Sequence, residues 1–208
     1  MMRSGTLASP REVWVVVLIK GFEEAKQRLR PALGPAQRRE LAERNARLAL
    51  AAAGAGERVL AVCGSGAAAR LAGEAGAEVL LEDWPGGQNL AARRGIEHAR
   101  ARGAEAVLLL SSDLPLVSRA AIAAMLAAAR RMGRPAAMAA PAVGRGGTNA
   151  LYLCPPDVLG LHFGDDSLGK FARDAAGRGV RFELYESPDL ALDLDEPADL
   201  EELRRLAG

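Results

Sequence analysis

Three aspartates stand where the chain could hold a divalent cation. Asp113 follows the apolar run AVLLL at 106–110 and precedes Pro115, which cannot continue a strand ladder. Asp193 and Asp195 are two positions apart in LALDLDEP, so on an extended segment their carboxylates point the same way. Crowded carboxylates are costly unless a cation lies between them, and oxygen ligands with few histidines favour Mg²⁺ over zinc. The three are candidate Mg²⁺ ligands; an Asx turn and caps of a strand and a helix are the structural alternatives.

A basic segment follows the first apolar run of the chain. LIKGFEEAKQRLRPALGP carries Lys20, Lys26, Arg28 and Arg30. Mg²⁺ held by few carboxylates usually takes phosphate oxygens as further ligands, and Lys and Arg neutralise the remaining phosphate charge. The segment is therefore a candidate triphosphate-binding loop. The alternative is a solvated surface loop whose long stems only cover apolar neighbours.

The remaining reactive side chains are few. His98 lies within a predicted helix and His162 stands beside Phe163, so both are expected to be structural. Cys63 and Cys154 stand alone without CxxC spacing, which argues against a disulfide framework or a cysteine zinc site and fits a reducing cytoplasm. The chemistry is therefore expected to depend on carboxylates and cations.

An alternation of apolar runs and alanine-rich segments must position these groups. Strands are predicted at 12–19, 58–63, 77–81 and 104–110, and helices at about 36–53, 66–75, 88–102 and 118–132, the last capped by Ser118. This order predicts a mostly parallel α/β sheet with helices on both faces. Such sheets bind ligands at the carboxyl ends of their strands, which is where Asp113 and Lys20 stand.

The alternation of apolar runs and alanine-rich segments ends after residue 134. The glycine loop VGRGGTN precedes the apolar ALYL, and CPPDVLGLHFGDDS is typical of irregular structure. A helix at 167–177 and a strand at 180–185 follow, and the chain ends as a short strand before a helix that starts near Pro197. No repeat or linker interrupts the chain. We therefore expect one domain over 13–208 after a loose extension over 1–12.

Composition indicates one globular domain. The 208 residues, half hydrophobic and a quarter charged, are too few for two comfortable domains. A net charge of +1 and the lack of about 18 consecutive apolar residues predict no nucleic-acid partner and no membrane span. The charge is uneven, with eight basic and four acidic residues over 20–47, but nine acidic residues and no Lys or Arg over 182–203. This asymmetry suggests separate roles for the two stretches.

A nicotinamide-binding Rossmann fold is one alternative. Gly64, Gly66 and Ala69 form GxGxxA after a strand, and Glu82 with Asp83 follow about 20 residues later, as in a dinucleotide fingerprint. The pattern lies in the second βα unit rather than the first, and a chain rich in Ala and Gly produces such patterns by chance. We therefore expect alanine to be tolerated at both glycines where their backbone angles allow it.

Together the motifs resemble the 2-phospho-L-lactate guanylyltransferase family of coenzyme F-420 biosynthesis. The resemblance covers the chain from Val13 and is carried by LIKGFEEAKQRL, SSDLPL, GGTNALYLCPP, FGDDS and LDLDEPADL. It implies a Rossmann-like fold of the nucleotide-diphospho-sugar transferase (GT-A-like) type. It also implies transfer of GMP from GTP to 2-phospho-L-lactate, phosphoenolpyruvate or 3-phosphoglycerate, with release of pyrophosphate. Because SDLP alone also fits other nucleotidyltransferases, one with a sugar phosphate or molybdopterin acceptor is the alternative.

The resemblance also implies residue roles. It implies that Asp113, Lys20 and Lys26 are catalytic and that Mg²⁺ is bound by Asp113, Asp193 and Asp195. The implied triphosphate or nucleotide contacts are Lys20, Lys26, Arg28 and Asn89. The implied acceptor contacts are Thr148, Gly164 and Ser167. The acceptor phosphate is already an anionic nucleophile, so the reaction needs positioning and charge neutralisation rather than a general base. The scarcity of histidine agrees with this. The family further suggests a homodimer.

Several positions depart from the family pattern. Gln27 stands where members usually have serine, and Leu168 and Phe171 replace the usual phenylalanine and histidine after FGDDS. Asp165 and Asp166 add negative charge beside the expected anionic acceptor. These changes leave the reaction class standing and the identity of the phosphoacid open. Spacing alone also does not determine the preferred base.

Overall fold

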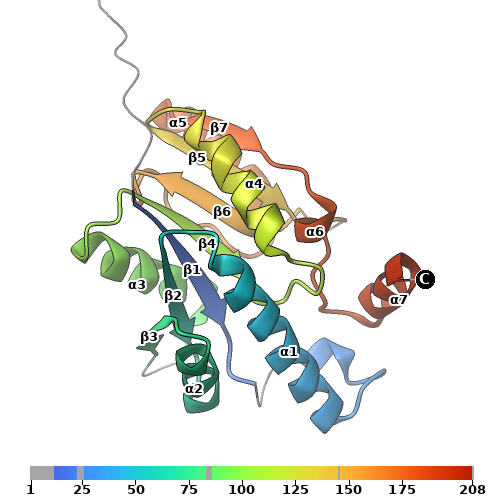
Figure 1. Cartoon of the computed structure of the whole chain (residues 1–208). Helices are drawn as coiled ribbons and strands as arrows, with labels where there is room; N and C mark the ends of the chain where they lie inside the picture. Colours follow the sequence, from blue (N-terminus) through green and yellow to red (C-terminus); the bar gives the residue numbers. More distant parts are fainter. Residues whose placement is uncertain (1–11, 23–25, 83–85, 145, 208) are drawn as a thin grey trace, which may run out of the picture.

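The computed structural model describes residues 12–22, 26–82, 86–144 and 146–207. Within these ranges, seven strands form one sheet of order β3-β2-β1-β4-β6-β5-β7 (Figure 1). The strands are β1 (Val13–Ile19), β2 (Arg58–Cys63), β3 (Glu78–Leu81), β4 (Ala106–Ser111), β5 (Ala136–Pro141), β6 (Thr148–Cys154) and β7 (Arg181–Leu184). The mostly parallel α/β sheet expected from the sequence is confirmed.

The parallel and antiparallel parts of the sheet meet at β4. Strand β1 pairs in parallel with β2 and β4, and β2 with β3, whereas β6 runs antiparallel between β4 and β5. Because Leu110 lies opposite Ala150 in this register, Thr148 at the start of β6 lies at the carboxyl end of β4. Because β6 runs antiparallel to β4, the GGTN loop lies at the same edge of the sheet as Asp113.

Helices cover both faces of the sheet (Figure 1). They are α1 (Pro35–Ala53), α2 (Gly66–Glu74), α3 (Gly87–Ala101), α4 (Arg119–Arg130), α5 (Ser167–Arg178), α6 (Pro188–Ala191) and α7 (Pro197–Ala207). Val13, Val15 and Val17 of β1 pack with α1, α2 and α4, whereas the alternate residues Trp14 and Val16 pack with α3 and α5. A strand buried on both faces explains the unbroken apolar run VWVVVLI.

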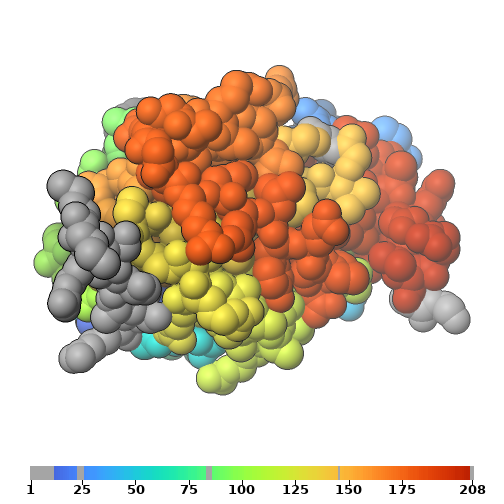
Figure 2. Space-filling model, turned by 90° about the horizontal axis from the view of Figure 1, so that it is seen from above, coloured from blue at the N-terminus to red at the C-terminus, as the bar shows by residue number. Residues whose placement is uncertain are grey.

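Most predicted elements match the structure to within one or two residues, and Ser118 caps α4 by accepting a hydrogen bond from the Ala121 N–H. Two expectations differ. Strand β5 was not predicted, and the short strand expected before the last helix is wrong, because 192–196 joins no strand. There the Leu194 N–H instead donates to the Asp113 carbonyl, at 3.1 Å. Figures 1 and 2 show α7, the red end of the chain, at the margin of the molecule.

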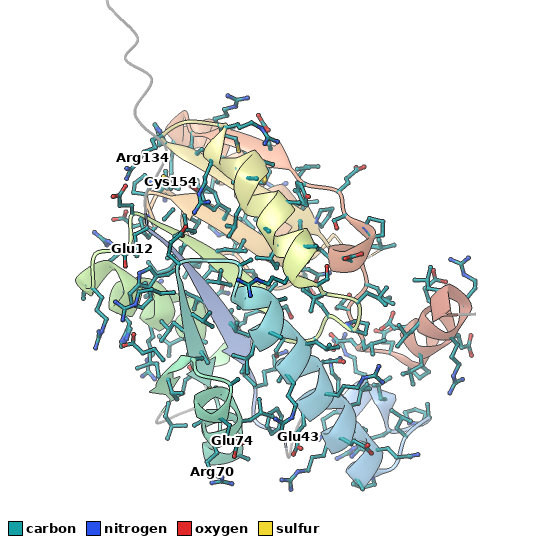
Figure 3. All side chains as sticks on the ribbon, in the orientation of Figure 1. Glu12, Glu43, Arg70, Glu74, Arg134 and Cys154 are labelled. Carbon is teal, nitrogen blue, oxygen red and sulfur yellow. The ribbon has the colours of Figure 1, made fainter. Side chains whose placement is uncertain are left out.

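Both cysteines are free and buried, as expected without a disulfide framework. Cys154 is labelled in Figure 3 beside Arg134, at the end of the sheet where β1 begins and away from the strand ends that carry Asp113. None of the helices that the structure describes combines the length and hydrophobicity needed to cross a bilayer. Residues 1–11 of the expected N-terminal extension lie outside the described part of the chain.

Candidate active site

A buried lysine joins two of the predicted aspartates. Lys26 follows β1, Asp113 follows β4, and Asp195 precedes α7. The Lys26 ammonium lies 2.6 Å from Asp113 Oδ1 and 3.4 Å from Asp195 Oδ1. Its side chain is 1% exposed, against 22% for Asp113 and 35% for Asp195. Three segments far apart in sequence thus form one charge cluster at the carboxyl edge of the parallel strands.

Backbone hydrogen bonds hold Asp113 and the acidic segment together. The Asp113 carbonyl accepts from the Leu194 N–H at 3.1 Å and from the Asn45 amide at 3.4 Å. Leu194 is fully buried, so it anchors the segment between the two C-terminal aspartates. Asp199 accepts the backbone N–H groups of Asp195 and Glu196 at 2.8 and 2.6 Å, which leaves the Asp195 carboxylate facing Lys26 rather than capping α7.

Asn149 positions the acidic segment from the other side. Its buried amide donates to the carbonyls of Leu190 and Ala191, at 2.8 and 3.2 Å. The Val143 N–H also donates to the Ala191 carbonyl, at 3.0 Å. Asn149 was not singled out from the sequence, although it stands next to Thr148 in GGTN. Its role depends on a partner 41 residues away, which no local motif reveals.

Two of the three predicted metal ligands lie against the same side chain. Asp113 and Asp195 share one cation, the Lys26 ammonium, so the pair suits a positively charged group. Within the described ranges, no three His, Cys, Asp or Glu side chains converge closely enough to hold a metal ion by themselves. The role of the partly buried Asp193 as a third metal ligand stays a prediction. A pair of carboxylates fits Mg²⁺, which commonly completes its shell with water and substrate phosphate oxygens.

Two cavities meet at this cluster. The larger, of about 490 Å³, is lined by Leu18, Ile19, Lys20, Gly21, Val62, Gly64, Ser65, Glu82, Gly87, Gln88, Ala91, Ser111 and Asp113. The smaller, of about 280 Å³, is lined by Lys20, Phe22, Lys26, Gln27, Arg28, Ala42, Ser112, Asp113 and Asp195. Lys20 and Asp113 line both cavities. A ligand with an apolar ring at one end and a charged group at the other would fit across the junction.

The predicted acceptor residues lie together on the same edge. The hydroxyl of Ser167 at the start of α5 donates to that of Thr148 at the start of β6, at 3.0 Å, and both residues are buried. The Leu168 N–H donates to the Gly146 carbonyl at 3.1 Å, which ties the glycine loop to α5. Gly164 has a φ of +117°, a conformation that favours glycine. These residues do not line the two cavities described above.

The comparison with protein families decides the class of the protein. A sequence model described as "Guanylyl transferase CofC like" matches residues 13–205. The chain belongs to this family. The relatives of this CofC-like chain include proteins named phosphoenolpyruvate guanylyltransferase from Rubrobacter xylanophilus (40% identical; 94% of this chain, 95% of the relative) and Conexibacter woesei (37%; 93% and 87%). A 2-phospho-L-lactate guanylyltransferase of Methanothermobacter thermautotrophicus is 31% identical, covering 90% and 82%.

Solved structures agree on the fold of the CofC-like chain. A Desulfovibrio desulfuricans G20 protein, solved as a candidate nucleotide-diphospho-sugar transferase, superposes with a TM-score of 0.76 at 18% identity, covering 93% of this chain and 87% of its own. A Mycobacterium tuberculosis H37Rv protein solved with manganese gives a TM-score of 0.50 at 18% identity, covering 92% and 97%. The expected nucleotidyltransferase fold and guanylyltransferase class are confirmed.

Asn89 braces the site of the CofC-like chain rather than facing either cavity. Its amide N–H donates to the Phe163 carbonyl at 3.0 Å, and its carbonyl oxygen accepts from the Phe163 N–H at 2.8 Å. This pair fastens α3 to the loop before α5. The nucleotide contact suggested for Asn89 stays a prediction.

The departures from the family pattern have structural partners. Phe171 is fully buried and packs edge-to-face against His162, with ring centres 5.4 Å apart. Asp166 accepts a hydrogen bond from Arg173 at 2.8 Å, and this bond lowers the pKa of Asp166. The exposed Lys170 donates to the backbone carbonyl of Asp165. The negative charge of Asp166 is thus offset by the hydrogen-bonded Arg173 and by the nearby positive charge of Lys170.

The two glycines of the dinucleotide-like pattern differ in the space they leave for a Cβ atom, and the tolerance of alanine stays a prediction. A Cβ on Gly64 would lie 3.0 Å from the backbone nitrogen of Gly21, so this glycine lets the loops after β1 and β2 pack closely. At Gly66 a Cβ would meet only the Arg70 guanidinium, at 3.7 Å, which is an ordinary contact. Gly64 also lines the larger cavity, so its close packing helps to shape the cavity wall.

Proposed function

We propose that this guanylyltransferase moves GMP from GTP to the phosphate of a three-carbon phosphoacid in coenzyme F-420 biosynthesis, with phosphoenolpyruvate as the first acceptor to test. The observation that carries the proposal is the Lys26–Asp113–Asp195 cluster at the junction of two cavities. The names of the Rubrobacter and Conexibacter relatives support phosphoenolpyruvate over 2-phospho-L-lactate and 3-phosphoglycerate. We assign the activity to one domain over residues 13–208.

The two cavities suggest how GTP would bind. The larger has the apolar walls that suit a nucleoside, including Leu18, Val62 and Ala91. The smaller is lined by Lys20, Lys26 and Arg28, which suit a polyphosphate. The α-phosphate would then lie at their junction, beside Lys20 and Asp113. Arg28 is 71% exposed and 3.5 Å from Glu196, so it is free to turn toward a ligand.

We assign the metal to Asp113 and Asp195 and identify it as Mg²⁺, with Asp193 added only by the family resemblance. When bound, Mg²⁺ supplies positive charge next to the α-phosphate. Lys26 would then exchange its two carboxylate partners for phosphate oxygens. The Asp113 backbone, held by Asn45 and Leu194, keeps its carboxylate in place during this exchange.

The acceptor would approach from the side of β6. Thr148 and Ser167 offer hydroxyl groups for its carboxylate, near the N-terminus of α5, where an anion is favoured. An oxygen of the acceptor phosphate attacks the α-phosphorus of GTP, the bond from that phosphorus to the β-bridging oxygen breaks, and pyrophosphate leaves with its electron pair. Lys20 and Lys26 neutralise the charge that develops on the leaving group.

The test is pyrophosphate release from GTP and Mg²⁺ with phosphoenolpyruvate, 3-phosphoglycerate and 2-phospho-L-lactate offered separately. We expect release that depends on one acceptor. We expect Asp113→Asn to lower turnover by about 10³-fold, because the metal loses a charged ligand. Asp157→Asn is the matched control, since Asp157 is half-exposed, pairs with Arg100 and lines neither cavity.

No release with any phosphoacid, while GTP still binds, would reject the proposed acceptors. Near-normal turnover of Asp113→Asn would reject the metal site. A homodimer, suggested by the family, and a cytoplasmic location, suggested by the unpaired cysteines, are further parts of the proposal. Light scattering of the purified protein tests the first.

A further inference from the structure

Glu82 is a carboxylate of the larger cavity that the transfer reaction does not use. It directly follows β3, and its backbone N–H donates to the Cys63 carbonyl at 2.9 Å, which holds it at the carboxyl edge of the sheet. Its side chain lines the cavity that we assign to the nucleoside. One oxygen, Oε1, is buried and has no hydrogen-bond partner among the described residues.

A buried carboxylate oxygen without a donor is costly, so it needs an explanation. Burial raises the pKa of Glu82, and the nearby positive charge of Arg94 opposes this shift. The negative charge of Glu82 adds to the effect of burial in raising the pKa of nearby Cys63 to about 12, so Cys63 remains a thiol. Among the described residues no group donates a hydrogen bond to Oε1 of Glu82, and a ligand in the cavity can supply one.

The sheet sets the distance between Glu82 and the reacting phosphate. Strand β3 is three positions from β4 in the order β3-β2-β1-β4. With strands about 4.8 Å apart, their carboxyl ends are about 14 Å apart. This span accommodates a nucleoside monophosphate with a metal–oxygen bond at the Asp113 end and a hydrogen bond at the Glu82 end. Glu82 therefore lies at the far edge of the base when the α-phosphate is beside Asp113.

The arrangement of hydrogen-bond donors on the bases then indicates which base Glu82 can bind. Two acceptor oxygens of a carboxylate match two adjacent N–H donors, and among the common bases only guanine presents such a pair, N1–H and the 2-amino group. Adenine and cytosine offer one amino group beside a ring acceptor, and uracil offers one N–H between two carbonyls. Accepting both guanine donors would also satisfy the orphan oxygen of Glu82.

We propose that Glu82 determines the guanine specificity of this enzyme by accepting hydrogen bonds from N1–H and the 2-amino group. The inference rests on the proposed use of GTP and on the placement of the nucleoside in the larger cavity. Glu82 is one of the residues in the dinucleotide-like pattern of the sequence. The proposed role differs from the ribose contact of that pattern, because Glu82 lines the same cavity as Lys20 and Asp113 but lies three strands away from Asp113.

The test is Glu82→Gln, which keeps the shape of the side chain and replaces one acceptor by an NH₂ donor. Binding of GTP, ITP and XTP with Mg²⁺ is measured by titration calorimetry without acceptor. Because hydrogen bonds to charged groups are strong, GTP affinity should fall about 10- to 100-fold. XTP, which carries a carbonyl in place of the 2-amino group, should gain about 10-fold. The exposed Glu97→Gln on α3 is the matched control and should leave all three affinities unchanged.

Three results would overturn the inference. The first is unchanged GTP binding by Glu82→Gln. The second is an equal loss for GTP, ITP and XTP. The third is a loss that disappears when 2′-deoxy-GTP replaces GTP, which would place Glu82 on the ribose instead. Since the assay contains no phosphoacid, an enzyme that binds GTP selectively but transfers to none of the proposed acceptors would contradict the proposed function and leave the role of Glu82 intact.

Discussion

Lys26→Met tests the charge cluster directly, since methionine keeps much of the volume and removes the ammonium. At an effective dielectric constant of about 20, Lys26 attracts Asp113 by about 6 kcal/mol at 2.6 Å and Asp195 by about 5 kcal/mol at 3.4 Å. Desolvation of the buried lysine offsets much of this attraction. Loss of one partner of a buried pair typically costs about 3–5 kcal/mol, and the partial exposure of both carboxylates favours about 3 kcal/mol here.

The assay is thermal unfolding without nucleotide, at low and at millimolar Mg²⁺. For a chain of this size about 3 kcal/mol corresponds to a fall of roughly 6–12 °C in Tm. Mg²⁺ should restore most of this loss in Lys26→Met, because a cation again lies between Asp113 and Asp195. It should stabilise the wild type much less, since the ammonium already occupies that place. The exposed Lys170→Met is the control and should change neither Tm nor its Mg²⁺ dependence.

Two results would refute this reasoning. If Lys26→Met unfolds within about 1 °C of the wild type, which corresponds to about 0.3 kcal/mol, the ion pairs contribute nothing to the stability. If Mg²⁺ fails to stabilise the variant more than the wild type, the two carboxylates do not form a cation site. The double variant with Asp113→Asn adds a further check, because the two changes should be less than additive when the residues interact.

Two further predictions concern α5, which carries Ser167 of the proposed acceptor site and Asp174. Ser167→Ala should raise the KM for the phosphoacid about 10-fold with little change in the KM for GTP, because it removes one hydroxyl of the buried Ser167–Thr148 pair; equal changes in both constants in initial-rate kinetics would contradict this. For Asp174, burial opposes ionisation, but hydrogen bonds from Arg178, His162 and the Gly160 N–H outweigh it and lower the pKa to about 2. A depressed pKa stabilises the fold above the unfolded value of about 3.9 and ceases to do so as pH falls toward 2. In urea unfolding, Asp174→Asn should therefore be less stable than the wild type by about 2 kcal/mol at pH 7, and the gap should close between about pH 4 and pH 2; a gap independent of pH would refute the assignment.

Local sequence was sufficient to predict the parallel half of the sheet and its helices. Strand β1 is buried at every position, so its apolar run is unbroken, and α4 has its Ser118 cap where the sequence indicates one. The C-terminal half was harder. Strand β5 is AAMAAP, an alanine-rich run whose composition also suits a helix, and it forms a strand because β6 and β7 pair with it on both sides. Pairing of this kind is a tertiary effect that a local pattern does not contain.

The sequence by itself determined the chemical groups of this protein: aspartates after apolar runs, a basic loop, few histidines, and motifs in an order that indicates the guanylyltransferase family. Only the tertiary structure decided which of these groups meet. The antiparallel β6 brings Thr148 to the edge of Asp113, and Asn149 and Leu194 hold the segment that places Asp195 against Lys26. The physical reason is that these contacts join residues as many as 169 positions apart, and their geometry depends on strand order and buried hydrogen bonds.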